Sequence, residues 1–143
     1  MTTLTNRLIV SDAEAALRFY EAAFDARVLE RFRDEALGRI VHAAFQIGDD
    51  LVISLADEDR HHGNVAPTSL GGSPVLFTLT VDDPDAWGRR FEAAGGRVLI
   101  PIDDRFYGHR EGRFRDPFGH LWIISKIIED LSPEEIHRRM QGS

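Results

Sequence analysis

An internal repeat at a nearly constant offset limits the folds open to this chain of 143 residues. Val10-Ser11-Asp12 matches Val81-Asp82-Asp83 at an offset of 71, and Arg27-Val28-Leu29 matches Arg97-Val98-Leu99 at an offset of 70. Two further matches keep the same order, Phe19 with Phe91 and Gly48 with Gly119. Repeats of such a length are supersecondary units that bury their apolar faces on each other. The sequence therefore predicts two related modules in one domain.

The hydrophobic pattern predicts a βαβββ order in the first module, residues 4–56. The expected strands cover residues 4–10, 28–32, 39–47 and 51–55. A helix is expected after Asp12, because Asp is a good N-cap and apolar residues from Ala15 to Ala23 recur at helical spacing. Residues 57–73 are polar and rich in Gly and Pro, which predicts a linker or loop.

The second module, residues 74–126, repeats this order. Strands are expected at 75–81 and 97–100 and in a final hairpin over 106–124, with a helix that opens at Pro84, where proline is tolerated. A capping-box pattern at Ser132 to Glu135 predicts a C-terminal helix over residues 132–141.

The final hairpin carries the most specific motif of the chain. Phe106-Tyr107-Gly108 precedes Arg113-Phe114-Arg115-Asp116-Pro117-Phe118-Gly119-His120-Leu121-Trp122. Alone, this pattern indicates a surface hairpin with Pro117 in its turn. It also resembles the closing hairpin of the vicinal-oxygen-chelate superfamily, above all its PhnB-like, glyoxalase/bleomycin-resistance-like branch.

The resemblance covers nearly the whole chain, and it implies an α+β fold of two βαβββ modules whose mixed sheets pair as an open cup. It also implies a homodimer, since an open sheet edge and an open cup invite a partner. In metal-dependent members of this family, a His on the first strand and a Glu on the last strand of each module bind the metal. Here the corresponding positions hold Thr5, Leu76, Ile123 and either Val52 or Ser54. None of these is an ordinary ligand for a divalent metal, so we expect no metal and no cofactor.

Strand alternation predicts which side chains line the cup. His42 either faces the cup or packs as a half-buried strand residue, and Tyr107 and His109 contact a ligand if their loop folds over the cup. The expected ligand-binding residues are Thr5, Arg7, His42, Ser54, Thr78, Thr80, Tyr107, His109 and Ile123. No residue is assigned a catalytic role. A wall of this kind, apolar and hydroxyl-lined with one Arg, suits an aromatic or amphipathic small molecule.

Two other groups of side chains have competing interpretations. Arg113 and Arg115 share one strand face, and pairing with nearby acids is favoured over binding of an anionic ligand. His61-His62 follows an acidic run, where solvation is favoured over metal binding.

Composition excludes several other classes of protein. The net charge of −7 argues against a nucleic-acid-binding protein. No apolar run approaches the roughly 18 residues of a membrane span, and no secretory leader follows Met1. The absence of Cys excludes disulfides and fits a cytoplasmic location.

Three functions remain for comparison. The favoured one is a metal-independent protein that binds an antibiotic or aromatic compound. The second is a metal-dependent lyase or dioxygenase with unconventional ligands, for which His42 and His109 are the only sensible donors. The third is a module that binds another protein through the linker or the terminal helix.

Overall fold

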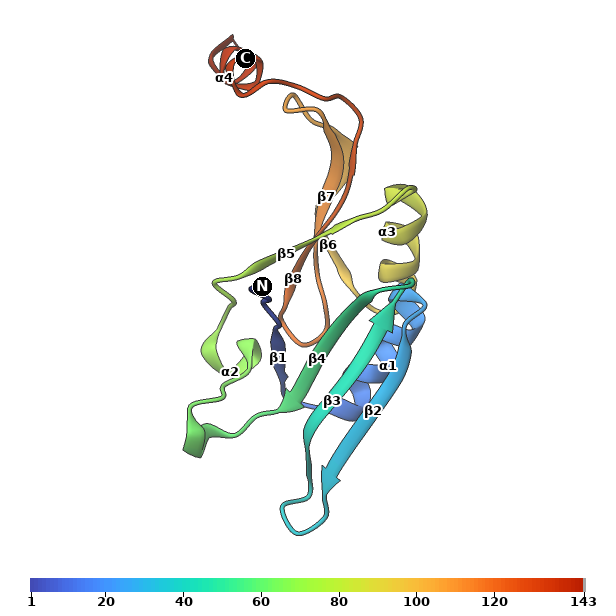
Figure 1. The fold of residues 1–143 in the computed structure, drawn as a ribbon, viewed down its shortest axis with the longest axis vertical. Helices are drawn as coiled ribbons and strands as arrows, with labels where there is room; N and C mark the ends of the chain where they lie inside the picture. Colours follow the sequence, from blue (N-terminus) through green and yellow to red (C-terminus); the bar gives the residue numbers. More distant parts are fainter. Residues whose placement is uncertain (143) are drawn as a thin grey trace.

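The computed structural model of the chain describes residues 1–142 and has two successive βαβββ modules (Figure 1). The first contains β1 (Arg7–Val10), α1 (Ala13–Phe24), β2 (Arg27–Asp34), β3 (Arg39–Ile47) and β4 (Leu51–Asp57). The second contains β5 (Leu76–Thr80), α3 (Pro84–Ala93), β6 (Arg97–Asp104), β7 (His109–Arg115) and β8 (Leu121–Ile127). A 3-10 turn (Arg60–His62) and α2 (Pro67–Leu70) lie between the modules, and α4 (Pro133–Gly142) follows them.

Each module forms its own four-stranded mixed sheet. The strand orders are β1-β4-β3-β2 and β5-β8-β7-β6. The first strand of each sheet is parallel to the last strand of its module, and all other neighbours are antiparallel. The predicted α+β fold of two βαβββ modules is confirmed, as is a C-terminal helix. Within residues 1–142, no helix has the length and apolar character needed to cross a bilayer.

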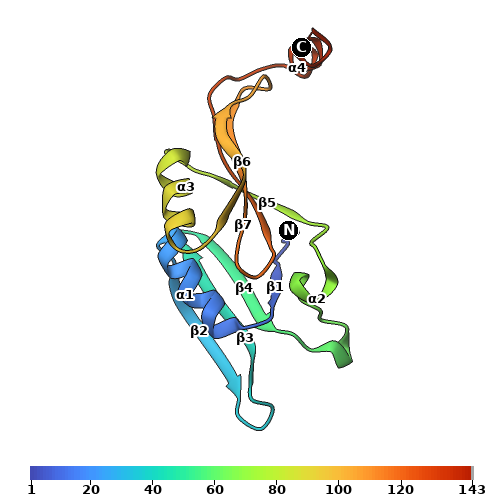
Figure 2. The same ribbon diagram turned by 180° about the vertical axis from the view of Figure 1, so that it is seen from behind.

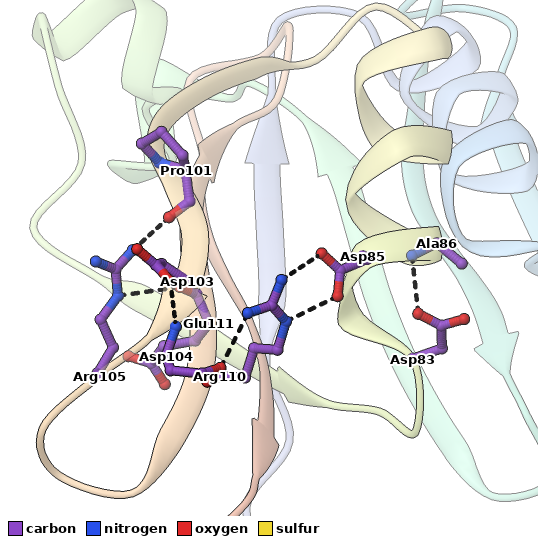
Figure 3. Close-up of polar contacts among 9 residues, drawn as sticks. All are labelled: Asp83, Asp85, Ala86, Pro101, Asp103, Asp104, Arg105, Arg110 and Glu111. Atoms are coloured by element: carbon purple, nitrogen blue, oxygen red, sulfur yellow. Dashed lines mark hydrogen bonds and ion pairs between the residues drawn. The ribbon is translucent and has the colours of Figure 1, made fainter.

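The sequence repeat is also a repeat of local geometry. Asp12 and Asp83 cap α1 and α3, and each carboxylate accepts a hydrogen bond of 3.1 Å from the backbone N–H three residues later (Figure 3 shows Asp83 and Ala86). Gly48 and Gly119 occupy the matching β-turns with φ of 62° and 89°. Glycine reaches positive φ without steric cost, which explains its presence in both turns.

One core joins the two modules. Helices α1 and α3 each cover one face of their own sheet and lie against each other (Figures 1 and 2). Tyr20 of α1 stacks on Phe45 of its own sheet, and its ring centroid lies 5.8 Å from that of Trp122 in the other sheet. The remaining face of each sheet is not covered by these helices, and it is this face that carries the candidate site.

A buried carboxylate ties the closing turn to α1. Asp116 accepts hydrogen bonds from the Tyr20 hydroxyl, from Trp122 Nε1 at 2.9 Å, and from two backbone N–H groups of its own turn. Burial raises the pKa of Tyr20 well above its ordinary value, and the negative charge of Asp116 adds to this shift. The phenol therefore stays protonated and keeps donating to Asp116. Nε2 of His120 donates a hydrogen bond of 2.9 Å to the backbone carbonyl of Ile9 in β1, so this side chain joins the two modules.

Several element bounds differ from the predicted ones. The first strand begins at Arg7 instead of residue 4, because its parallel pairing with β4 starts with Arg7 opposite Ser54. Thr5, which was expected on this strand, therefore lies before β1 and is exposed. β6 runs to Asp104 instead of residue 100, since it regains pairing with β7 after a register shift.

Candidate functional site

The uncovered face of the first sheet carries a short polar chain of side chains. Nε2 of His42 lies 2.9 Å from Oε1 of Glu30, and the Arg7 guanidinium lies 3.4 Å from Nδ1 of the same ring. The imidazole also stacks on Phe32, with 5.7 Å between the ring centroids. His42 thus faces away from α1 and lies beside Arg7, one of the two arrangements that the sequence left open.

The uncovered face of the second sheet carries a denser network centred on Glu111 of β7. Its Oε2 accepts a 2.6 Å hydrogen bond from the Tyr107 hydroxyl, and its Oε1 accepts a 2.8 Å bond from Ser125 Oγ of β8. Nδ1 of His109 lies 3.1 Å from the same Oε1. Alternation along β7 places His109 and Glu111 on one face, and the cross-strand pair Glu111–Ser125 completes the cluster.

This network shifts the pKa of two of its members in opposite directions. Burial raises the pKa of Tyr107 to about 12, and the hydrogen bond to Glu111 and the charge of Glu111 act in the same direction. Burial also raises the pKa of Glu111, but the hydrogen bonds from Tyr107, Ser125 and His109 outweigh it and hold that pKa below its ordinary value. At neutral pH, Tyr107 is therefore a donor and Glu111 a carboxylate whose lone pairs are engaged.

A pocket of about 190 Å³ opens beside this network. Its lining residues are Ile100, Arg105, Tyr107, Glu111, Gly112, Arg113 and Ile123. Arg113 lies directly opposite Ile100 of β6 on one side and Ile123 of β8 on the other. The pocket therefore combines an apolar floor with a guanidinium, a phenol and a carboxylate.

Two arginines near the end of the β6–β7 hairpin, Arg105 and Arg110, form hydrogen bonds in different directions (Figure 3). Arg105 donates to the carbonyls of Pro101 and Glu111, which bridges the stretch where the β6–β7 ladder is irregular. Arg110 reaches the other way and forms a bidentate ion pair with Asp85 of α3 at 2.9 Å. The hydrogen bonds from Arg110 lower the pKa of Asp85. Both arginines hold the hairpin, and only Arg105 also borders the pocket.

The structure gathers the residues predicted to bind a ligand into separate groups. Arg7 and His42 come together on the first sheet, and Ser54 lies opposite Arg7. On the second sheet, Tyr107 and Ile123 line one pocket, with His109 beside it. Thr78 lies opposite Ile123, and Thr80 lies opposite Ser125, both on β5. Thr5 lies before β1 and belongs to neither group.

The three charged residues of the pocket, Arg105, Glu111 and Arg113, were not among the predicted ligand-binding residues, although anion binding had been the less favoured interpretation of Arg113. Alternation from His109 would have found Glu111 and Arg113, since 109, 111 and 113 share a face. The expectation that Arg113 and Arg115 pair with nearby acids is wrong, because neither forms an ion pair within the described part of the chain. Asp116, one of those acids, is instead committed to Tyr20 and Trp122.

The side chains in these groups do not fit a divalent metal. His42 and His109 each have one carboxylate neighbour, Glu30 and Glu111, and the two pairs lie on different sheets. Nowhere in residues 1–142 do three His, Cys, Asp or Glu side chains come together in a way that would hold a metal ion. His62 lies 2.6 Å from Asp59, a single carboxylate partner.

Paired βαβββ sheets with a polar pocket on an uncovered face define a class of two-module α+β proteins. The chain belongs to the Glyoxalase/Bleomycin resistance protein/Dioxygenase superfamily, whose family model matches residues 3–124. The uncharacterized protein Rv0887c of Mycobacterium tuberculosis is 38% identical over 141 residues, which cover 97% of this chain and 82% of that protein.

Solved structures share the fold. TioX from Micromonospora sp. ML1 is 26% identical with a TM-score of 0.66, and the match covers 89% of this chain and 99% of TioX. The fosfomycin resistance protein FosX from Mesorhizobium loti is 21% identical with a TM-score of 0.64, over 87% of this chain and 91% of FosX. At that identity, the likeness to FosX shows the fold alone.

Proposed function

We propose that this protein binds a small organic molecule without a metal, as a glyoxalase/bleomycin-resistance-like binding protein. The observation that carries this function is the pocket on the second sheet, which Tyr107, Glu111 and Arg113 line together with Ile100 and Ile123. Small-molecule sites characteristically combine apolar walls with a few polar groups that fix orientation. The antibiotic or aromatic character of the compound remains a prediction from the sequence, as does membership of the PhnB-like branch.

A thermal-shift screen with aromatic and hydrophobic compounds tests this function. A compound present at a hundredfold its Kd stabilises the folded protein by about 2.7 kcal/mol. Ile123→Glu places a second carboxylate in the pocket and should abolish the shift. Ile127→Glu is the matched control, because Ile127 shares the strand and face but is exposed and does not line the pocket. If no compound raises the melting temperature, the proposed function fails.

The alternative function is a metal-dependent lyase or dioxygenase, in which the pairs His42–Glu30 and His109–Glu111 would supply the metal ligands. The protein is incubated with Zn²⁺, Ni²⁺, Mn²⁺ and Fe²⁺ in turn and desalted, and metal per chain is measured. We expect no metal to be retained. About one equivalent, lost on His42→Ala or His109→Ala, would favour the alternative function.

The protein is further proposed to act as a homodimer in the cytoplasm. Large apolar side chains on the uncovered faces are solvent-exposed, including Phe32 and Val52 on the first sheet and Leu76 and Ile100 on the second. Exposed apolar groups on a concave or flat sheet face favour a protein partner. Light scattering on the purified chain should give twice the 16.1 kDa of one chain, and Leu76→Asp should reduce this mass. A monomeric wild type would contradict the dimer.

A further inference from the structure

The charges around the pocket on the second sheet are not balanced. Arg105, Glu111 and Arg113 are its charged lining residues, two cations against one anion. Glu111 has little capacity left for a ligand, since both of its oxygens already accept hydrogen bonds from Tyr107 and Ser125. Two guanidinium groups against one carboxylate give the pocket lining a net positive charge, although the chain as a whole is acidic.

Arg113 is the source of that positive character. Arg105 uses its guanidinium on the carbonyls of Pro101 and Glu111. Arg113 has no ion pair within residues 1–142, and its Nε is buried without a hydrogen-bond partner. A buried donor left unpaired is costly, and a charge-assisted bond to an anion would remove that cost. Arg113 as a whole is half-buried, and Nε is the atom of its guanidinium that is buried without a partner.

The immediate neighbours of Arg113 define the rest of the ligand. Ile100 and Ile123 lie directly opposite it on the two adjacent strands, so an anion on the guanidinium has apolar surface on both sides. The carboxylate of Glu111, on the same strand face, disfavours a second negative charge nearby. The volume of about 190 Å³ is below the roughly 300–1,000 Å³ of sites for drug-sized ligands.

We propose that this pocket binds a small monocarboxylate with an aromatic or branched apolar body, and that Arg113 holds its carboxylate. The planar fork of a guanidinium matches a carboxylate with two parallel hydrogen bonds. The Tyr107 hydroxyl already donates to Glu111. This inference rests on the proposed function and adds the charge and size of the compound.

Isothermal titration of the full-length protein at pH 7 tests it with benzoate and cyclohexanecarboxylate as probes. Benzamide is the neutral counterpart of benzoate, and inorganic phosphate is an anion without an apolar body. We expect both carboxylates to bind at least about tenfold more tightly than benzamide or phosphate, the effect of one charge-assisted hydrogen-bonded pair. Added salt should weaken carboxylate binding.

Arg113→Met should weaken benzoate binding at least about tenfold and leave benzamide binding unchanged. Because this variant removes an unpaired buried donor, it should melt no lower than the wild type. A lower melting temperature would instead indicate a structural role for Arg113. Arg113→Lys keeps the charge without the fork and should fall between the two. Arg115→Met is the matched control, since Arg115 lies on the same strand but is exposed and outside the pocket; it should bind benzoate as the wild type does.

The two levels of the proposal fail differently. One set of results would overturn the carboxylate inference and leave the proposed function standing. In it, neutral aromatic compounds bind, Ile123→Glu abolishes their binding, and Arg113→Met leaves benzoate binding unchanged. If phosphate binds more tightly than benzoate, the apolar part of the inference is overturned. If neither charged nor neutral compounds bind, both the inference and the proposed function fail.

Discussion

The phenol oxygen of Tyr107 lies 2.6 Å from Oε2 of Glu111, and this hydrogen bond joins the β6–β7 turn to the pocket wall. Burial has the largest effect on the pKa of Tyr107 and raises it, and the hydrogen bond to Glu111 raises it further. The same hydrogen bond lowers the pKa of Glu111. The pair therefore stays as a neutral donor and an anionic acceptor across the physiological range. Its consequence for the pocket is that Glu111 keeps its negative charge while its Oε2 already accepts a hydrogen bond.

Tyr107→Phe should raise the pKa of Glu111, because the carboxylate loses a donor. In the wild type, the lowered folded-state pKa contributes stability that is present above the unfolded value of about 4.3 and lost as pH falls through the folded pKa. The variant should lose less stability on acidification. A carbon-13 carboxyl titration measures the pKa, and urea unfolding at neutral and acidic pH measures the stability.

Ser125→Ala tests the same network at the other carboxylate oxygen of Glu111, since Ser125 donates a 2.8 Å hydrogen bond to Oε1. It should shift the pKa of Glu111 in the same direction as Tyr107→Phe. An unchanged Glu111 pKa in both variants would mean that the network does not control this carboxylate.

Tyr20→Phe should lower the free energy of unfolding at pH 7 by about 1–3 kcal/mol, because the buried Asp116 loses a donor. The pH dependence has the opposite sign to that of Glu111. A raised phenol pKa contributes stability that is present below about pH 10 and is lost as pH rises above it. The variant should therefore lose less stability than the wild type between neutral and strongly alkaline pH. Equal alkaline slopes in urea unfolding would contradict the role of Tyr20.

The two turn glycines should respond differently to alanine. Gly48→Ala meets open space, so its cost is the positive φ alone, about 1–2 kcal/mol. Gly119→Ala would also place its Cβ 2.8 Å from Cβ of Pro67 in α2, which adds about 1–3 kcal/mol of overpacking. Chemical denaturation of both variants checks the difference. Equal losses would show that α2 moves aside without cost.

The repeat and the hairpin motif were enough to predict the modules, because capping residues and alternating apolar residues act locally. Asp12 and Asp83 cap helices as their positions predict. The strand of His42 was predicted with its bounds, Arg39–Ile47. The face of His42 was not, since Phe32 and Glu30 come from another strand whose register includes two irregular steps.

The site was less accessible to sequence reasoning for a related reason. Glu111 is recognisable only once Tyr107, His109 and Ser125 are known to converge on it. The pairing expected for Arg113 failed because nearness in sequence does not place an acid on the same face, and Asp116 turns into the core. β6 continues past an irregular step in its ladder with β7, where Arg105 donates to the carbonyls of Pro101 and Glu111, and no local pattern encodes such a step.

The N-caps give the most direct energetic test of the repeat. Asp12→Ala and Asp83→Ala each remove one 3.1 Å hydrogen bond to a backbone N–H in the first turn of a helix. Each should lower the free energy of unfolding by about 1 kcal/mol. Because α1 and α3 pack in one core, each variant should show a single cooperative unfolding transition. The double variant should lose about the sum, since the two caps share no partner. Two separate transitions in either single variant would show that the modules unfold independently, and a loss confined to one cap would show that the repeat is one of sequence alone.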